Sequence, residues 1–294
     1  MASSRATSAL AIEDIFAANE AKREFAFSDE DFKFLSELAY ERSGIVWSAS
    51  KRNLAYGRLS RRLRALKLNS FRQYRDYLTS NPREIENFIN SISTNHTKFF
   101  RENHHFEHFH AHVAKPLALQ RTSQRVRIWS AGCSSGEEPY TIAAVLAAEL
   151  GGVGKHDIKM LATDIDTDIL AKAARGEFPG STVQDVPAKY RPFFDDVETV
   201  RGQTTIYMPA ELRNMIAFRQ LNLLGPWPFK GLFDAIFCRN VMIYFDGPTK
   251  ENLIERFAAQ LKPGGWLYIG HSESLIGVHP GLKLMGRTIY RRAG

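Results

Sequence analysis

The sequence predicts an α/β protein in which a doubly wound, mostly parallel sheet follows an all-helical N-terminal domain and carries a small inserted β-subdomain. Helical periodicity runs from residue 28 to about residue 112, and strand and helix patterns alternate from residue 125 onward. Such alternation is typical of a parallel sheet with helices on both faces. A stretch rich in Pro, Asp and Gly at about 179–214 breaks the alternation, and we interpret it as an insertion.

The predicted domain organisation has four segments. They are a flexible leader at 1–27 with one short helix at 12–24, a helical domain at 28–98, a linker helix with its connection at 99–124, and the sheet domain at 125–294. Ser28 is a good N-cap for a first helix. Leu59, Leu63 and Leu66 recur at helical spacing, which predicts a helix of about 15 residues around them.

The sheet domain divides into elements by its apolar runs and its breaker residues. In order, we expect a strand at 126–130, a helix at 138–150, a strand at 158–163, a helix at 168–175, a hairpin around 200–207, strands at 216–221 and 233–238, a helix at 249–261, a turn at 262–265, a strand at 266–270, and a closing hairpin of 282–284 with 288–291.

Composition excludes several classes of protein. With 44% hydrophobic and 24% charged residues, the 294-residue chain is neither disordered nor fibrous. No apolar run approaches the ~20 residues of a membrane span, and the first residues lack the apolar core of a signal peptide. Cys133 and Cys238 have no paired spacing, which is typical of a reducing compartment. We therefore expect a cytoplasmic protein without direct membrane insertion.

The formal net charge of +7 is concentrated in one segment. No acidic residue lies between Glu41 and Asp76, a stretch rich in Lys and Arg. With the leucines facing a core, Arg58, Arg61 and Arg62 share one flank of the predicted helix. A basic run is often only a solvated helix face, but the missing counter-charge favours a surface that docks an acidic partner. Nucleic acid is disfavoured because no helix-turn-helix, zinc-finger spacing or RNP-type strand is present.

A loop of small residues joins the first strand of the sheet domain to its first helix. This loop has neither the GxGxxG pattern nor a Walker lysine. Glu137 and Glu138 begin the helix and would repel a phosphate there, so they suit a positively charged ligand. Asp164, at the end of the next strand, is placed to bind ribose hydroxyls, although it could instead cap the following helix. S-adenosylmethionine, an adenosine ligand with a cationic end, fits both features.

The fourth predicted strand ends in a second group of polar residues. There Asn240 and Tyr244 could contact cofactor and substrate, or Tyr244 could be a packing aromatic. The Asn/Asp-Pro-Pro-Tyr signature of enzymes that methylate amino groups is absent. His104, His108 and His112 share a helix face at metal-compatible spacing, but no HExxH motif or cysteine cluster accompanies them. We therefore expect no metal.

Six motifs occur in the order of a known family: TNHTKFFRE (94–102), AGCSSGEEPY (131–140), TDIDTDIL (163–170), NLL (222–224), FDAIFCRNVMIYF (233–245) and LKPGGWLYIGHSES (261–274). In them the chain resembles the chemotaxis receptor methyltransferase family, CheR (protein-glutamate O-methyltransferase), over nearly its whole length. The resemblance implies a class I S-adenosylmethionine methyltransferase fold and methyl transfer to glutamate side chains of chemoreceptors, with S-adenosylhomocysteine as second product. It implies the acidic, helical cytoplasmic domain of a receptor as partner. We expect the enzyme to be monomeric.

The resemblance also implies roles for single residues. The residues similar to cofactor ligands of the family are Asn95, Thr97, Arg101, Glu137, Asp164, Asn222, Leu223, Arg239 and Asn240. Arg101 and Tyr244 resemble the residues near the methyl-transfer point. Spacing alone leaves open whether Glu137 or Glu138 makes the main cofactor contact. Because a glutamate carboxylate is already ionised at pH 7, no general base is needed, and we expect Arg101 and Tyr244 to orient it.

One feature departs from part of the family. Some members carry a GxGxxxG turn in the inserted subdomain, associated with docking of a peptide at the receptor tail, whereas the stretch 194–203 here has a single glycine. Our hypothesis is that this chain does not depend on a tethering pentapeptide, and micromolar binding of such a peptide in calorimetry would contradict it. Two other functions stay open: methylation of RNA or a small molecule, and a cofactor-binding scaffold without catalysis.

Overall fold

The computed structural model describes residues 23–152, 156–273 and 280–294. The chain forms two compact units, Met1–Ile92 and Ser93–Gly294. The predicted helix at 12–24 lies almost wholly outside the described residues. The division falls slightly before the boundary expected at residue 98. No helix within the described ranges is long and apolar enough to cross a membrane.

In the described part of the first unit, all regular secondary-structure elements are helices. Its helices are α2 (Asp29–Ser43), the 3-10 turn η1 (Ala49–Lys51), α3 (Arg52–Leu66), α4 (Phe71–Ser80) and α5 (Glu84–Ile92). Ser28 caps α2 as expected: its hydroxyl accepts from the Asp31 N–H at 3.1 Å, and Asp31 accepts from the Ser28 N–H at 3.0 Å. Leu59 and Leu63 of α3 are fully buried, so the leucine spacing identified the face of α3 that packs into the core.

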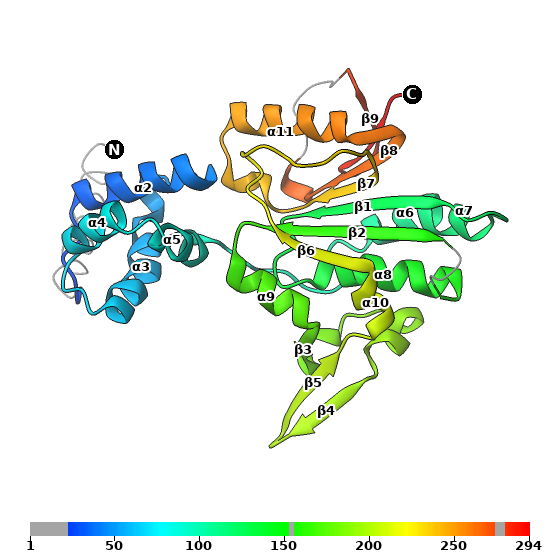
Figure 1. Cartoon of the computed structure of the whole chain (residues 1–294), viewed down its shortest axis with the longest axis horizontal. Helices are drawn as coiled ribbons and strands as arrows, with labels where there is room; N and C mark the ends of the chain where they lie inside the picture. The colour runs from blue at the N-terminus through cyan, green and yellow to red at the C-terminus, as the bar shows by residue number, and fades with distance from the viewer. Residues whose placement is uncertain (1–22, 153–155, 274–279) are drawn as a thin grey trace, which may run out of the picture. The chain divides into compact units, whose positions relative to one another are not determined.

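The second unit contains a seven-stranded sheet, confirming the predicted fold class (Figure 1). Its strands are β1 (Arg125–Ala131), β2 (Asp157–Asp164), β6 (Ile216–Gln220), β7 (Phe233–Cys238), β8 (Leu261–Ile269), β9 (Leu282–Gly286) and β10 (Ile289–Arg292). The strand order is β6-β2-β1-β7-β8-β10-β9. The first five pair in parallel, and β10 pairs antiparallel with both β8 and β9. The carboxyl ends of the parallel strands therefore meet at one edge.

Helices cover both faces of this sheet. They are α6 (His104–Phe109), a π-helical segment η2 (His110–Ala114), α7 (Lys115–Ala118), α8 (Glu137–Leu150), α9 (Thr167–Arg175), α10 (Ala210–Met215) and α11 (Gly247–Gln260). Figure 1 shows α11 over one face and α8 over the other. Side chains alternate along β1 accordingly: Ile128 joins the core that includes α8, and Trp129 joins the core that includes α11.

The inserted subdomain is a separate three-stranded antiparallel sheet. It consists of β3 (Glu177–Pro179), β4 (Val197–Val200) and β5 (Gln203–Tyr207), with 3-10 turns η3 (Gly180–Val183) and η4 (Ala188–Phe194) between the first two strands. The β4–β5 hairpin extends away from the large sheet (Figure 1). Its two-residue turn, Arg201 and Gly202, has φ of +51° and +77°. The single glycine of this stretch therefore serves the hairpin turn.

The predicted turn at 262–265 is wrong, because these residues open strand β8. Gly264 adopts a φ of +75°, and the pairing register of β7 with β8 shifts between Phe233 and Ala235. The Lys262 ammonium lies 2.8 Å from each carboxylate oxygen of Asp234 on β7, which holds the irregular stretch against its neighbour. The Pro-Gly-Gly signal marks a distorted strand start here.

Candidate functional site

The loop between β1 and α8 is fastened to the carboxyl end of β2. The Gly132 and Cys133 N–H groups both donate to the Thr163 carbonyl, at 2.7 and 2.9 Å. Gly132 has a φ of +83°, and a Cβ there would lie 2.3 Å from the Val241 side chain. Only glycine fits this position, and it lets the segment after β7 approach the loop closely.

Asp164 lies at the centre of this loop cluster and is 9% exposed. Its carboxylate accepts hydrogen bonds from the Ser134 N–H at 2.8 Å and from the Asp166 N–H at 3.1 Å. Burial raises the pKa of Asp164, and these N–H groups partly offset the rise. The capping role belongs to Asp166, which accepts from the Asp168 and Ile169 N–H groups of α9. Asp164 is thus not needed as the helix cap.

Ser134 adds a polar atom without a protein partner. Its residue is 9% exposed, and its buried hydroxyl has no hydrogen-bond partner within the described residues. Its φ of +50° is rare for a residue with a side chain. An orphaned hydroxyl beside a buried carboxylate is what a hydroxyl-rich ligand such as a ribose would satisfy.

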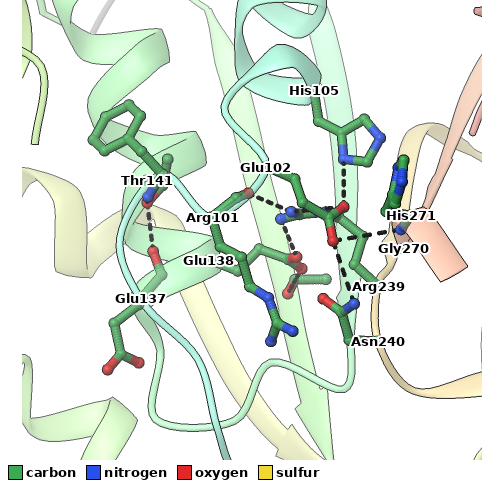
Figure 2. Close-up of polar contacts among 12 residues, drawn as sticks. Arg101, Glu102, His105, Glu137, Glu138, Thr141, Arg239, Asn240, Gly270 and His271 are labelled. Carbon is green, nitrogen blue, oxygen red and sulfur yellow. Dashed lines mark hydrogen bonds and ion pairs between the residues drawn. The ribbon is translucent and has the colours of Figure 1, made fainter. Parts of the chain in front are cut away.

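Glu137 and Glu138 differ in what holds them. Glu138 accepts from the Ser130 hydroxyl at 2.7 Å and from Arg239 at 3.1 Å, so both of its oxygens have protein partners. Glu137 accepts from the Ser135 hydroxyl at 2.6 Å, and Figure 2 shows its carboxylate pointing away from Arg239. Burial raises the pKa of both carboxyls. The two neighbouring acids therefore face different surroundings.

The segment before α6 is bonded to the loop that follows β2 and to helix α8. The Asn95 amide donates to Asp166 at 2.6 Å, and the Phe100 N–H donates to the Thr141 hydroxyl of α8 at 3.3 Å. Arg101 donates to the His96 carbonyl at 2.7 Å. Thr97, also predicted as a cofactor ligand, is half-buried in the same segment.

Arg239 follows β7 and is enclosed by protein groups. It is 6% exposed and stacks over the Phe106 ring at 5.1 Å. Its guanidinium bonds Glu138 at 3.1 Å, lies 3.4 Å from Glu102, and donates to the Arg101 carbonyl. Figure 2 shows it between the two carboxylates. Arg239 therefore joins the linker segment, α8 and β7.

Asn240 lies next to this network in a left-handed conformation, with a φ of +60°. Its N–H donates to Glu273 at 2.8 Å, and its side-chain amide donates to Glu102 at 3.3 Å. The buried Glu273 carboxylate also accepts from the Gly270 and Ile243 N–H groups. Tyr244 ends the adjoining 3-10 turn η5 (Met242–Tyr244) and is half-buried.

Asn222 and Leu223 lie in the loop after β6. The Asn222 side chain accepts from the Leu224 N–H at 3.0 Å. The Leu223 carbonyl accepts from the Trp227 indole at 3.1 Å and from Arg256 of α11 at 2.6 Å. Arg256 also lies 3.9 Å above the Trp227 ring. One arginine thus holds the loop that carries two predicted cofactor ligands, Asn222 and Leu223.

In the structure, acidic residues that are distant in the sequence form ion pairs with arginines of the basic helix α3. Arg62 forms two hydrogen bonds to the buried Glu84 of α5, at 2.9 and 2.8 Å. Arg58 donates to the Ile92 carbonyl. Arg61 is exposed and has no ion pair among the described residues. The expectation that these arginines lack an acidic partner is therefore wrong for Arg62. Docking of an acidic partner by Arg58, Arg61 and Arg62 stays a prediction.

The histidines of the linker helix have partners of their own. His108 pairs with the Tyr268 hydroxyl at 3.1 Å, and its ring stacks on His112 at 4.1 Å. The His104 ring lies tilted against the His105 ring, with the ring centroids 4.1 Å apart. Within the described ranges, no group of three or more His, Cys, Asp or Glu could hold a metal ion.

Three residues of this site were missed by sequence reasoning: Glu102, Glu273 and Arg256. Glu102 and Glu273 lie inside two of the motifs that carry the family resemblance. Their position in these motifs was therefore a sign of a functional role, although no role was assigned to them. Arg256 is on α11, outside the six motifs, and only the fold brings it to the loop after β6.

The parallel sheet, the acids at the start of α8 and Asp164 at the end of β2 fit a methyltransferase that uses S-adenosylmethionine. Two family models match: "CheR methyltransferase, SAM binding domain" over residues 95–291 and "CheR methyltransferase, all-alpha domain" over residues 30–93. The chain therefore belongs to the CheR methyltransferase family.

Curated relatives agree over most of the chain. It is 44% identical to the probable chemotaxis protein methyltransferase of Rhizobium etli, covering 82% of this chain and 91% of that protein. It is 42% identical to chemotaxis protein methyltransferase 2 of Pseudomonas aeruginosa, covering 92% and 96%. It is also 42% identical to the chemotaxis protein methyltransferase of Escherichia coli, covering 90% and 91%.

Proposed function

We propose that this protein transfers a methyl group from S-adenosylmethionine to glutamate side chains of chemoreceptors, forming γ-glutamyl methyl esters. The observation that carries the proposal is a charge contrast. The site presents two acids, Glu137 and Asp164, which suit a sulfonium cofactor. Arg101 nevertheless lies in the segment that is bonded to α8 and to the loop after β2. A cation placed beside a sulfonium cofactor suits an acceptor substrate that is an anion. A glutamate carboxylate meets that requirement.

The residues present fit the cofactor. When bound, S-adenosylmethionine supplies a methyl group activated by its sulfonium. Asp164 would accept hydrogen bonds from the ribose, where the orphaned Ser134 hydroxyl lies. Glu137 would pair with the ammonium, because Glu138 is already engaged by Ser130 and Arg239. Asn222 and Leu223 would line the adenine side.

Arg101 and Tyr244 orient the acceptor carboxylate in this proposal. A guanidinium can hold a carboxylate oxygen through its fork, and a phenol hydroxyl can hold the other. The carboxylate is ionised at neutral pH, so no residue must remove a proton. What these side chains supply is alignment and exclusion of water.

The receptor partner is supported by the basic helix α3. The names of the curated relatives point to chemotaxis, and the methylated region of a chemoreceptor is an acidic helical domain in the cytoplasm. Arg61, exposed on α3, would attract such a surface electrostatically. We place the reaction in the cytoplasm for this reason.

The test is transfer of a labelled methyl group in a reaction that contains both receptor fragments and RNA. We expect label on the receptor fragment only. Label on RNA would favour the nucleic-acid methyltransferase, and cofactor binding without label on any acceptor would favour a scaffold. In the same assay, Arg101→Ala should reduce kcat far more than it weakens cofactor binding in calorimetry. A variant with near-normal turnover would remove Arg101 from the catalytic role.

A further inference from the structure

We propose that Glu102 is a positioning residue of this enzyme, which fixes the Arg101 main chain and the Asn240 side chain in one geometry. The inference rests on the proposed function, because it concerns how the residues of that site are held. Glu102 touches neither reaction partner in this account. It acts through the two residues on either side of the site.

Glu102 contacts four residues, which lie in three segments of the chain. One carboxylate oxygen accepts from the Asn240 side-chain amide at 3.3 Å and from the His271 N–H at 3.4 Å. The other lies 3.4 Å from the Arg239 guanidinium and 3.5 Å from the His105 ring. Arg239 in turn donates to the Arg101 carbonyl. Figure 2 shows Glu102 at the centre of these contacts.

The backbone around this carboxylate is held in rare conformations. Phe100, Glu102 and Asn240 have φ of +52°, +55° and +60°. Each left-handed residue with a side chain costs about 1 kcal/mol or more, so surrounding contacts must hold it. Gly270 is part of the same packing, since a Cβ there would lie 2.7 Å from the Asn240 nitrogen. Backbone strain of this kind clusters at active sites and ligand-binding sites.

The charges of the network favour an ionised Glu102. Burial would raise its pKa, but Arg239, the Asn240 amide and the His271 N–H more than offset that effect, so the pKa is lowered. Burial, followed by Arg239 and His104, lowers the pKa of His105 to about 3, so His105 is neutral at pH 7. Arg239 is therefore the cation that Glu102 and Glu138 share. Removing the Glu102 charge leaves Arg239 drawn toward Glu138 alone.

The experiment is a pair of double-mutant cycles. Glu102→Gln keeps the shape of the side chain and removes its charge. The first cycle measures kcat for Glu102→Gln, Arg101→Ala and the double variant. The second measures the S-adenosylmethionine dissociation constant by calorimetry for Glu102→Gln, Asn240→Ala and their double variant. Glu107→Gln is the matched control, since Glu107 is exposed and its recorded hydrogen bond is from Asn103.

We expect Glu102→Gln alone to reduce kcat by about tenfold or more, because small displacements of a positioning group cost rate steeply. On an Arg101→Ala background the same change should cost less than about threefold, since the residue through which it acts is gone. The affinity loss should likewise shrink on the Asn240→Ala background. Glu107→Gln should leave both quantities unchanged.

Additive losses in both cycles, or a Glu102→Gln variant with wild-type kcat and affinity, would overturn the inference. If Glu102→Gln does not fold, Arg239→Lys takes its place, because a lysine cannot reach Glu102, Glu138 and the Arg101 carbonyl together. Failure of the proposed function is recognised separately. A wild-type enzyme that methylates no receptor refutes that function, while the affinity cycle still decides the role of Glu102.

Discussion

Asn95 and Asp166 are joined by a 2.6 Å hydrogen bond, and Asp166 uses its other oxygen to cap helix α9. The bond ties the start of the second unit to the loop that carries Asp164. We predict that Asn95→Ala weakens cofactor binding by about tenfold, because a hydrogen bond to a charged group contributes about 1.5–3 kcal/mol. Calorimetric titration with S-adenosylmethionine measures the effect. Asn103→Ala, which removes an exposed Asn–Glu pair, is the control, and equal affinities for the two variants would contradict the prediction.

Substitutions of Glu137 and Glu138 should affect different quantities, cofactor affinity for Glu137 and folding stability for Glu138. Glu137→Gln should weaken S-adenosylmethionine binding by about tenfold with little change in unfolding free energy, since an ion pair with the ligand is lost. Glu138→Gln should lower the free energy of unfolding by about 3 kcal/mol, because the buried Arg239 loses a charged partner. Calorimetry and urea unfolding measure the two quantities. The reverse pattern would assign the cofactor contact to Glu138.

Arg61 and Arg62 are neighbours with different predicted roles. Arg61→Glu should slow receptor methylation at low salt, lose most of that effect at high salt, and leave cofactor binding unchanged. Lys159→Glu, an exposed lysine on β2, makes the same charge change away from α3 and should have little effect. Identical rates for Arg61→Glu and wild type at low salt would refute docking through this residue.

Arg62→Ala should act on folding instead. Its partner Glu84 is 4% exposed, and removal of Arg62 leaves that carboxylate buried without its ion pair. We expect a loss of about 3 kcal/mol in the free energy of unfolding of the first unit. Urea unfolding followed at Trp47, in a variant lacking the other tryptophans, reports this unit. An unchanged midpoint would show that the pair contributes nothing to stability.

His105 should make the second unit less stable in acid. Its pKa is about 3 in the folded protein against about 6.5 when unfolded, so the unfolded chain binds more protons between these values. The stabilisation is complete above pH 6.5 and is lost as the pH falls toward 3. Between pH 7 and pH 5 this histidine should remove about 2 kcal/mol. Unfolding followed at Trp129, Trp227 and Trp266 measures it.

The control for this pH effect is the exposed His96. His105→Gln should flatten the pH dependence of unfolding by about the same 2 kcal/mol, and His96→Gln should leave the wild-type slope. Equal slopes for His105→Gln and wild type would show that another group is responsible.

Local patterns predicted the elements, while contacts between distant segments escaped prediction. Strand β7 has the predicted bounds, Phe233–Cys238, because an apolar run between polar breaks defines a buried strand. Leu59 and Leu63 identified the buried face of α3 for the same kind of reason. The prediction of a turn at Lys262–Gly265 was wrong because Pro-Gly-Gly occurs both in tight turns and at distorted strand starts. Only the contact of Lys262 with Asp234 on β7 distinguishes these two structures.

The site shows the same division. The sequence could predict Asp164 as a candidate ligand from its position at the end of a strand. It could not show whether Asp164 caps the next helix, because only the structure shows that Asp166 makes that cap. Spacing could not decide between Glu137 and Glu138, because the difference lies in Arg239, which is 101 residues away along the chain from Glu138. The pairing of Arg62 with Glu84 was equally hidden, since the acid follows 22 residues later on another helix.

The product of the proposed reaction is a glutamyl ester, and one measurement detects it directly. Receptor-containing membranes are incubated with the enzyme and tritium-labelled S-adenosylmethionine, and the washed product is treated with mild base. We predict that the label is released as volatile methanol, because a carboxylate methyl ester hydrolyses in base. Label that stays on the protein after base treatment would indicate methylation of an amide or ring nitrogen and would contradict the account.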